Sequence, residues 1–225
     1  TPAPVAAGEE EPVAQQTDDM PTPAASAPTQ AIAVLDEASF ADMLAKLEAA
    51  ELICVDTETD ALDAMQSGLV GLAFATEAGH GWYVPLTHDY LGAPKQLDRT
   101  AVLARVKPVL EDPGKPKVGQ HIKYDLNVLA RHGINVQGVA FDTMLESYVL
   151  DAAGNRHDMD SLAEKHLGHT TIKFSDVAGT GNPFQGDHNV AWQSADGDAR
   201  NYFLASDPQK FLDSISQVFA SLVHE

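Results

Sequence analysis

The pattern of apolar residues divides most of the chain into short strands and helices. Residues 31–36 (AIAVLD) predict a short strand. Residues 37–51 predict a helix, because their apolar positions recur every three or four residues. Three apolar, β-rich segments follow at residues 52–58, 69–76 and 81–87, separated by turn-like residues. Strands this close together along the chain are typical of an antiparallel meander, and we expect one here.

Helical spacing returns in the second half of the chain, where it alternates with a short apolar strand expected at residues 116–120. A final helical region is expected from about residue 190. The other expected helices cover residues 99–112, 123–133, 141–154 and 159–168, the last two with capping-box spacing at Thr143 and Ser161. A meander followed by alternating helices and strands indicates an α/β fold in which helices flank a mixed sheet.

The first part of the chain has a different composition from the rest. Residues 1–30 contain no Lys, Arg or aromatic residue and are rich in Pro, Ala and acidic residues. Such a segment cannot bury enough apolar surface to order itself. We therefore expect a disordered linker ahead of one domain at residues 31–225. The sequence starts at Thr1 without an apolar leader, which we interpret as the cut edge of a longer chain.

The charge balance is acidic, with 33 Asp and Glu residues against 14 Lys and Arg and a formal net charge of −19. Five of these acids lie in the linker, so the domain keeps 28 acids against 14 bases, a net charge of −14. Phosphate contacts need basic residues, so a DNA-directed function would depend on metal ions, local basic positions or a partner domain. The lone Cys54, expected as a small buried residue, excludes an intrachain disulfide, and no apolar run is long enough to span a membrane. The expected location is the cytoplasm.

Acidic residues gather at the end of the first strong strand, in VDTETD at residues 55–60. Alternate residues of a strand face one side, so Asp56 and Glu58 should project together. Carboxylates side by side repel each other, and a divalent cation would relieve that repulsion. A solvated acidic strand end fits this pattern equally well. Asp125 in KYD, near the start of an expected helix, fits either a metal ligand or an acid stabilised by the helix dipole.

Taken in order, several segments resemble the proofreading 3′–5′ exonuclease domain of bacterial DNA polymerase I. They begin with DTETDAL, continue through LVGLAFA, YVPLTHDYLGAP, KVGQHIKYDLNVL and FDTMLESYVL, end with RHDMDSLAEKHLG, and cover about residues 50–191. The resemblance implies a ribonuclease-H-like sheet and a DEDD-type exonuclease that uses two divalent metal ions, Mg²⁺ or Mn²⁺. It also implies a single-stranded or frayed DNA 3′ end as substrate, and a polymerase domain on the C-terminal side in the parent protein.

The resemblance assigns roles to three acids. Asp56 and Glu58 match the first exonuclease motif, and Asp125 matches the second. Asp56 would bridge the two ions, Glu58 would hold the ion on the nucleophile side, and Asp125 would hold the ion on the leaving-group side. Four further residues lie where contacts with the DNA strand are expected, although each also fits an ordinary surface position: Leu62, Gln120, Lys123 and Arg156.

The resemblance breaks at the third motif of that family, a Tyr-x-x-x-Asp on a late helix. The matching positions read Asp198-Ala-Arg-Asn-Tyr202, with the acid and the tyrosine exchanged, and the chain diverges after about residue 191. Pairing Tyr202 with Asp207 places them five residues apart, which is about 140° around a helix. Asp207 is therefore expected to cap a helix that begins at Pro208 rather than to bind metal.

Three functions remain open from the sequence. The leading prediction is a metal-dependent 3′–5′ exonuclease for DNA, weakened by its altered third motif. A non-catalytic scaffold with the exonuclease fold is the alternative, and the exchanged Asp198 and Tyr202 favour it. An RNA-directed exonuclease of the same fold is a third possibility. His157, Asp158 and Asp160 lack metal-ligand spacing, and a helix cap is expected at Asp160 or Ser161.

Overall fold

The computed structural model describes residues 30–89, 93–153, 156–168 and 170, together with the strand backbone of residues 192–193 and 199–200. Throughout these ranges, no helix has both the length and the apolar character needed to cross a membrane. The positions expected for the third motif, Asp198 and Tyr202, and the alternative position Asp207 lie outside the described residues.

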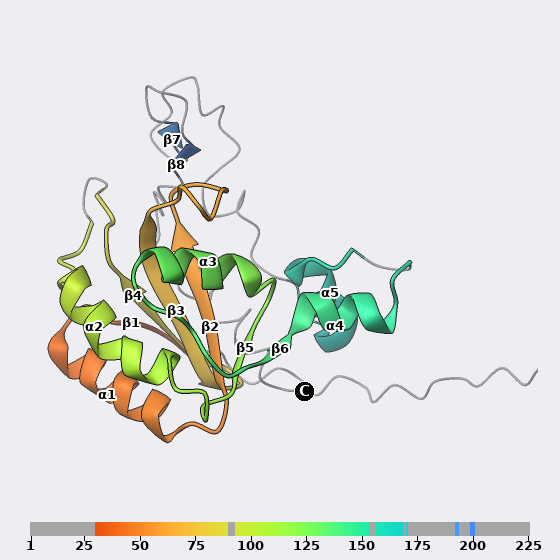
Figure 1. Cartoon of the computed structure of the whole chain (residues 1–225), viewed down its shortest axis with the longest axis horizontal. Helices are drawn as coiled ribbons and strands as arrows, with labels where there is room; N and C mark the ends of the chain where they lie inside the picture. Colours follow the sequence, from red (N-terminus) through yellow and green to blue (C-terminus); the bar gives the residue numbers. More distant parts are fainter. Residues whose placement is uncertain are drawn as a thin grey trace, which may run out of the picture.

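A six-stranded mixed sheet forms the centre of the fold (Figure 1). Its strand order is β1-β4-β3-β2-β5-β6. The expected meander is present, since β2 pairs antiparallel with β3, and β3 pairs antiparallel with β4. On one side β1 runs parallel to β4, and on the other β5 and β6 run parallel to β2. The strands are β1 (Gln30–Ala33), β2 (Ile53–Thr59), β3 (Leu69–Glu77), β4 (His80–Pro85), β5 (Lys117–Gly119) and β6 (Val139–Asp142).

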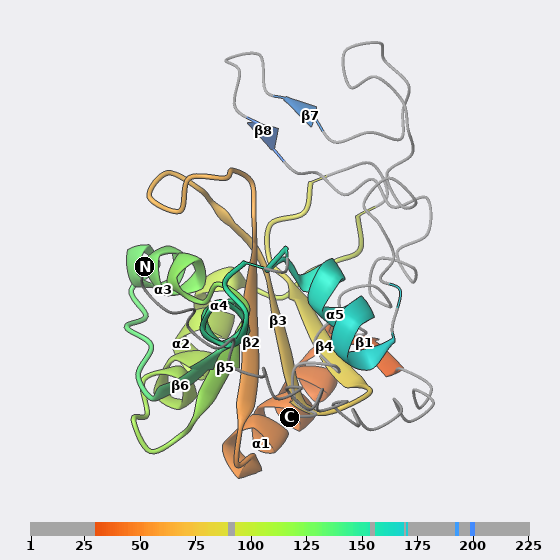
Figure 2. The same ribbon diagram turned by 90° about the vertical axis from the view of Figure 1, so that its right-hand side faces the viewer.

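Helices flank this sheet, as the hydrophobic pattern predicts. In Figure 1, α1 and α2 lie side by side toward the left of the sheet, α3 crosses in front of it, and α4 and α5 lie to the right beyond β6. Figure 2 shows the same layers from the side. The helices are α1 (Glu37–Ala49), α2 (Arg99–Leu110), α3 (Lys123–Arg131), α4 (Thr143–Leu150) and α5 (Met159–Leu167).

The main hydrophobic core lies between the sheet and the layer of α1, α2 and α3. Phe40 from α1, Phe74 from β3 and Trp82 from β4 are each at most 1% exposed. Burial of each large apolar side chain contributes about 1.5–3 kcal/mol. Alternation along β2 turns Ile53 and Val55 into this core. Residues 54, 56 and 58 therefore face the opposite side of the sheet.

The structure corrects the expected elements at three places. Residues 139–142 form strand β6, so the helix expected from residue 141 begins at Thr143 and ends at Leu150. Asp142 and Asp158, rather than Thr143 and Ser161, are the N-caps of α4 and α5. The helical region expected from about residue 190 is wrong where the chain is described, because two short strands pair there: β7 (Trp192–Gln193) and β8 (Ala199–Arg200).

Candidate active site

The candidate site lies at the edge of the sheet where the parallel strands β2, β5 and β6 end. Asp56 and Glu58 lie near the end of β2 and are half-buried. Asp125 belongs to the first turn of α3, which follows β5, and is 3% exposed. The crossover from β5 to α3 thus brings the second acidic motif beside the first, although they are far apart in sequence.

Thr57 connects the two acidic motifs. It lies between Asp56 and Glu58 and faces the helical layer, where its backbone N–H donates to Asp125 Oδ1 at 2.9 Å. Its hydroxyl donates to the same oxygen at 2.6 Å. Hydrogen bonds to a carboxylate hold it in one orientation and favour its charged form. The position of Asp125 is therefore fixed relative to the backbone of β2.

Burial raises the pKa values of all three acids, and the charges of neighbouring acids raise them further. Desolvation, followed by the charges of Asp125 and Glu58, raises the pKa of Asp56 well above its usual range. Desolvation and the charge of Asp125 raise the pKa of Glu58 to about 7. Burial likewise raises the pKa of Asp125 to about 6, against the two hydrogen bonds from Thr57, which lower it. Three acids concentrate negative charge that a cation would neutralise.

The donor chemistry of these acids fits a hard divalent cation, which prefers carboxylate oxygens. However, within residues 30–168 as described, no three acidic, histidine or cysteine side chains are arranged to hold an ion by themselves. Asp56 and Glu58 alternate toward one face of the sheet, whereas Asp125 comes from the helical side. Among the described residues, the three acids therefore do not make a complete ion site by themselves.

Small residues lie beside the two acids of β2. In the register of the sheet, Ala73 pairs with Asp56 and Gly71 pairs with Glu58. The side chain of Tyr83 from β4 covers Gly71, and a Cβ at Gly71 would lie 2.2 Å from the Tyr83 hydroxyl. That hydroxyl is 2.6 Å from His88 Nε2. Only glycine at position 71 leaves room for this tyrosine next to Glu58.

The loop between β2 and β3 presents Leu62 to solvent beside the site. Leu62 is 86% exposed, although the loop around it is well anchored. The Tyr124 hydroxyl donates to the Ala61 carbonyl oxygen at 2.7 Å, and Arg131 Nη1 donates to the Ser67 carbonyl oxygen at 2.6 Å. Tyr124 and Arg131 both belong to α3, so the helix that carries Asp125 also holds this loop in place.

The other residues expected to contact DNA have different environments. Lys123 is exposed at the start of α3. Gln120 uses both ends of its amide within the protein, because Nε2 donates to the His157 carbonyl oxygen at 2.8 Å and Oε1 accepts from the Thr143 hydroxyl. The Nε atom of Arg156 lies 3.0 Å from Asp158 Oδ2.

Two further expectations concern cysteine and histidine. Cys54 is fully buried, as expected for a small apolar residue. In RHDMD, Asp158 caps α5 by accepting from the Ser161 N–H at 3.0 Å, and His157 Nδ1 lies 2.8 Å from the Ser147 hydroxyl. A helix cap is present in this motif, but the expected position is wrong, because the cap is Asp158 and not Asp160 or Ser161.

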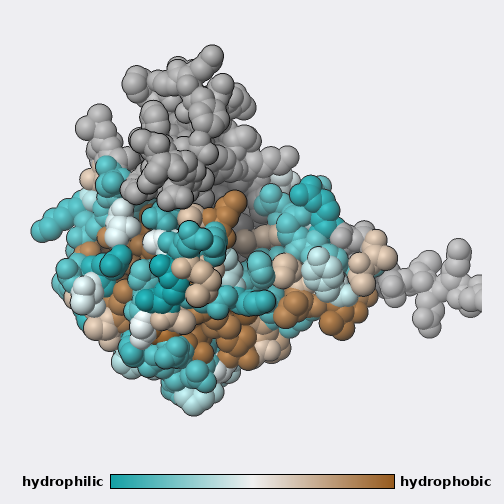
Figure 3. Space-filling model, turned by 45° about the horizontal axis from the view of Figure 1, so that its top comes forward, coloured by the Kyte–Doolittle hydropathy of each residue, from teal (hydrophilic) through white to brown (hydrophobic). Residues whose placement is uncertain are grey.

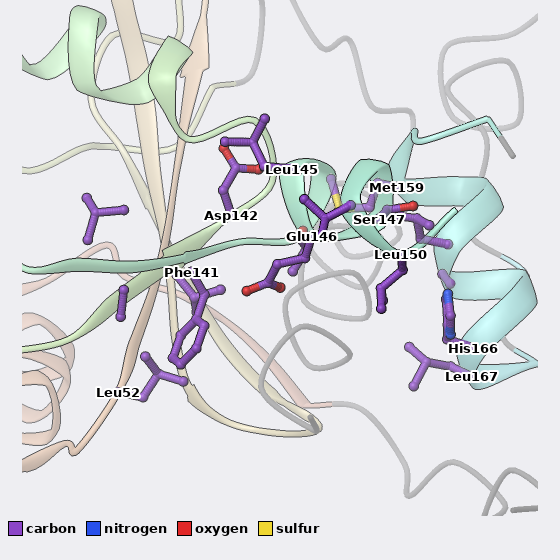
Figure 4. Close-up of a pocket in the computed structure, with 17 residues that line it drawn as sticks. Leu52, Phe141, Asp142, Leu145, Glu146, Ser147, Leu150, Met159, His166 and Leu167 are labelled. Carbon is purple, nitrogen blue, oxygen red and sulfur yellow. The ribbon is translucent and has the colours of Figure 1, made fainter. Parts of the chain in front are cut away.

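A separate apolar groove of about 870 Å³ lies between β6, α4 and α5. In Figure 4, Leu52 and Phe141 line the side toward the sheet, and Leu150, His166 and Leu167 line the opposite side. Figure 3 shows hydrophobic side chains on the right-hand lobe of the molecule, where these helices lie. Nothing among the described residues shows what covers this groove.

Comparisons with known proteins identify the family. Residues 31–199 match a family model described as 3′–5′ exonuclease. DNA polymerase I of Pseudomonas aeruginosa is 61% identical over 150 residues, which are 66% of this chain and 16% of that protein. DNA polymerase I of Rhizobium leguminosarum is 39% identical over 193 residues, which are 78% of this chain and 18% of that protein. The chain thus spans less than a fifth of these relatives.

The solved structures show the fold. The crystal structure of Trypanosoma brucei RNase D aligns with a TM-score of 0.60 at 14% identity, and the alignment covers 87% of this chain and 62% of that one. The mixed sheet flanked by helices is therefore ribonuclease-H-like, as the resemblance implies. On the strength of its sequence match and its fold, the chain belongs to the family of 3′–5′ exonuclease domains of DNA polymerase I.

Proposed function

We propose that residues 31–225 form a metal-dependent 3′–5′ exonuclease domain that removes nucleotides from DNA 3′ ends, as in proofreading. The observation that carries this proposal is the meeting of Asp56, Glu58 and Asp125 at one edge of the sheet, with Thr57 fixing Asp125 to β2. Membership of a 3′–5′ exonuclease family supports the same reaction. Residues 1–30 would act as a linker ahead of this domain.

The chain's own residues would bind and orient the components of the reaction. Asp56, Glu58 and Asp125 would hold two Mg²⁺ or Mn²⁺ ions, with the bridging and single-ion roles given above. Such ions supply a hydroxide at neutral pH and neutralise charge on the attacking and leaving oxygens. Binding a cation would favour the charged forms of acids whose pKa values are raised in the metal-free chain.

The substrate would be a single-stranded or frayed DNA 3′ end. Leu62 on its anchored loop offers an exposed apolar side chain against which a base can stack. Lys123 and Arg156 are exposed cations near this edge. Gln120 would act indirectly, through its hydrogen bond to the His157 carbonyl oxygen. Because the domain carries a net charge of −14, most of the affinity for DNA would come from metal ions and from a polymerase domain in the parent protein.

The altered third motif would weaken this activity. The family's tyrosine and fourth carboxylate are exchanged in this chain, as Asp198 and Tyr202, and Asp207 offers only an alternative register. Metal binding would need a ligand besides Asp56, Glu58 and Asp125, since no described group of three acidic, histidine or cysteine side chains could hold an ion by itself. The bacterial relatives and the single buried Cys54 support a cytoplasmic location.

The purified chain, incubated with an end-labelled single strand and Mg²⁺ or Mn²⁺, tests the proposal. Stepwise shortening from the 3′ end is expected, and Asp56→Ala should abolish it. Shortening no faster than that of the Asp56→Ala variant would leave a scaffold as the better description. Matched RNA and DNA strands in the same assay would show whether the substrate is RNA instead.

A further inference from the structure

Asp142 is a buried acid that makes an unusual number of backbone contacts. It is the last residue of β6 and is 8% exposed. Its Oδ1 accepts from the N–H groups of Met144 at 3.0 Å and Leu145 at 3.3 Å, which caps α4. The same carboxylate also accepts from the turn before α3: His121 N–H donates to Oδ1 and Ile122 N–H donates to Oδ2, both at 3.1 Å. One side chain therefore holds the starts of two helices.

The turn before α3 depends on this contact. His121 has a φ of 56°, the one positive φ of a non-glycine residue among the described parts of the chain. A left-handed conformation is unfavourable for such a residue and persists only where its surroundings hold it. The N-cap of α3, Ile122, has no side-chain hydrogen bond of its own to cap the helix. The backbone just before the helix is held instead by Asp142 on the neighbouring strand, which accepts from the His121 and Ile122 N–H groups.

The start of α3 sets the place of Asp125. Asp125 is the third residue of α3, one turn away from the N–H groups that Asp142 holds. On the other side, the Asp125 carboxylate accepts both hydrogen bonds from Thr57. In the register of the sheet, Asp142 pairs with Gly119 at the end of β5, so the acid and the turn share one sheet edge. Figure 4 shows Asp142 at the sheet end of the groove, where α4 begins.

We propose that Asp142 is a positioning residue of the candidate active site. By accepting from the His121 and Ile122 N–H groups, it fixes the direction in which α3 begins, and so keeps Asp125 within hydrogen-bonding distance of Thr57. The consequence for metal binding and catalysis rests on the proposed function, whereas the consequence for the Thr57–Asp125 contact does not.

The Asp142→Asn variant removes this role with little change in size. An amide has only one acceptor oxygen, and its NH₂ group would face an N–H of the turn or of α4, placing two donors together. Asp98→Asn is the matched control. Asp98 caps α2 through a hydrogen bond from the Ala101 N–H at 2.8 Å, and α2 contributes no residue to the candidate site.

Amide hydrogen exchange at Thr57 in the metal-free protein is the first measurement. Exchange should become about tenfold faster in Asp142→Asn than in Asp98→Asn when the two are compared at equal global stability. The second measurement is Mn²⁺ affinity by calorimetry, which should fall about tenfold in Asp142→Asn alone, as for residues that orient metal ligands. Equal Thr57 exchange in the two variants would overturn the proposal.

The two measurements also separate this inference from the proposed function. If the unaltered protein neither binds Mn²⁺ nor shortens DNA, the proposed function fails, while Thr57 exchange still decides the role of Asp142. Should Asp142→Asn not fold, the comparison is made in a His121→Gly background, because glycine adopts a φ of 56° without strain. If Asp142→Asn makes amide hydrogen exchange at Thr57 faster in the His121→Gly background, the positioning role is supported. Unchanged exchange refutes it.

Discussion

At the scale of single residues, burial and neighbouring negative charges make the ionised forms of the three acids of the site unfavourable. Most carboxylates in folded proteins have pKa values near or below those of model peptides. Here burial and repulsion raise the pKa of Glu58 to about 7 and that of Asp125 to about 6. The sequence could show that Asp56 and Glu58 alternate along a strand, but burial depends on packing that only the fold supplies.

Glu58→Gln should stabilise the metal-free protein at high pH. Because the pKa of Glu58 is about 7 in the folded chain against 4.5 as the ordinary value, the folded state binds more protons than the unfolded state between these values. The contribution of Glu58 to stability is therefore fully present below about pH 4.5 and is lost as the pH rises through about 7. We expect Glu58→Gln to raise the free energy of unfolding at pH 8 by about 1–3 kcal/mol.

Thermal and denaturant unfolding in EDTA at pH 5 and pH 8 would measure this effect. The exposed Glu51→Gln on the loop before β2 is the control and should change stability little at either pH. A stabilisation by Glu58→Gln that is equal at both pH values would contradict the explanation.

Thr57→Val should weaken metal binding in a pH-dependent way. Valine keeps the shape of threonine but removes the hydroxyl that donates to Asp125 at 2.6 Å. That hydrogen bond lowers the pKa of Asp125, so its loss raises the pKa further and leaves less carboxylate at neutral pH. A hydrogen bond to a charged group contributes about 1.5–3 kcal/mol, so Mn²⁺ affinity near pH 6.5 should fall at least about tenfold.

Calorimetric titration with Mn²⁺ at pH 6.5 and pH 8 would check this prediction. The loss should be smaller at the higher pH, where Asp125 is ionised in either protein. Thr87→Val serves as control, because the Thr87 hydroxyl also donates to a single acceptor, the Leu69 carbonyl oxygen, at 3.1 Å. An equal loss of Mn²⁺ affinity in Thr57→Val and Thr87→Val would contradict the prediction, because the loss would then not depend on the hydrogen bond to Asp125.

At the scale of elements, α3 organises the site. It supplies Asp125 directly, and it anchors the loop that carries Leu62 through Tyr124 and Arg131. The helix was expected from its apolar spacing. Strand β6 is not predicted from the pattern, however, because the helix expected at residues 141–154 includes the last two residues of this strand. A four-residue strand is too short for its alternation to be separated from helical spacing.

Leu62→Ala should weaken binding of a single strand without loss of stability. Leu62 is 86% exposed, so its removal leaves no cavity in the protein. Stacking of a base on an aromatic side chain contributes about 1–3 kcal/mol, and we expect the apolar contact with Leu62 to lie at the lower end, so KM for a labelled single strand should rise about fivefold. Val149→Ala, at an equally exposed position on α4, is the matched control and should leave KM unchanged. Unchanged KM in Leu62→Ala would exclude this contact.

At the scale of the whole molecule, the charge is unfavourable for DNA. The net charge of −19 repels phosphates over the whole surface, and three of the acids are concentrated at the candidate site. Divalent cations would reverse the local charge at the site, although they would leave the rest of the surface acidic. The domain is therefore expected to rely on metal for its own contact with a DNA end.

Binding of a fluorescent single strand should accordingly depend on divalent cations. We expect little change in anisotropy in EDTA and a clear increase with Ca²⁺ or Mn²⁺ at matched ionic strength. Monovalent salt alone should not reproduce this increase, because it screens charge without bridging carboxylates and phosphate. Binding in EDTA as tight as with divalent cations would contradict this dependence and would point to basic contacts elsewhere in the chain.

The sequence by itself determined the meander, the five main helices and the pair Asp56 and Glu58, because hydrophobic periodicity and strand alternation are local properties. The resemblance added Asp125. Only the tertiary structure decided that Thr57 links Asp125 to β2, that β6 completes the sheet, and that Asp142 holds the turn before α3. These features are contacts between segments that are distant in the sequence and come together only when the parallel strands pair. Local residue spacing cannot show which of those residues will face each other.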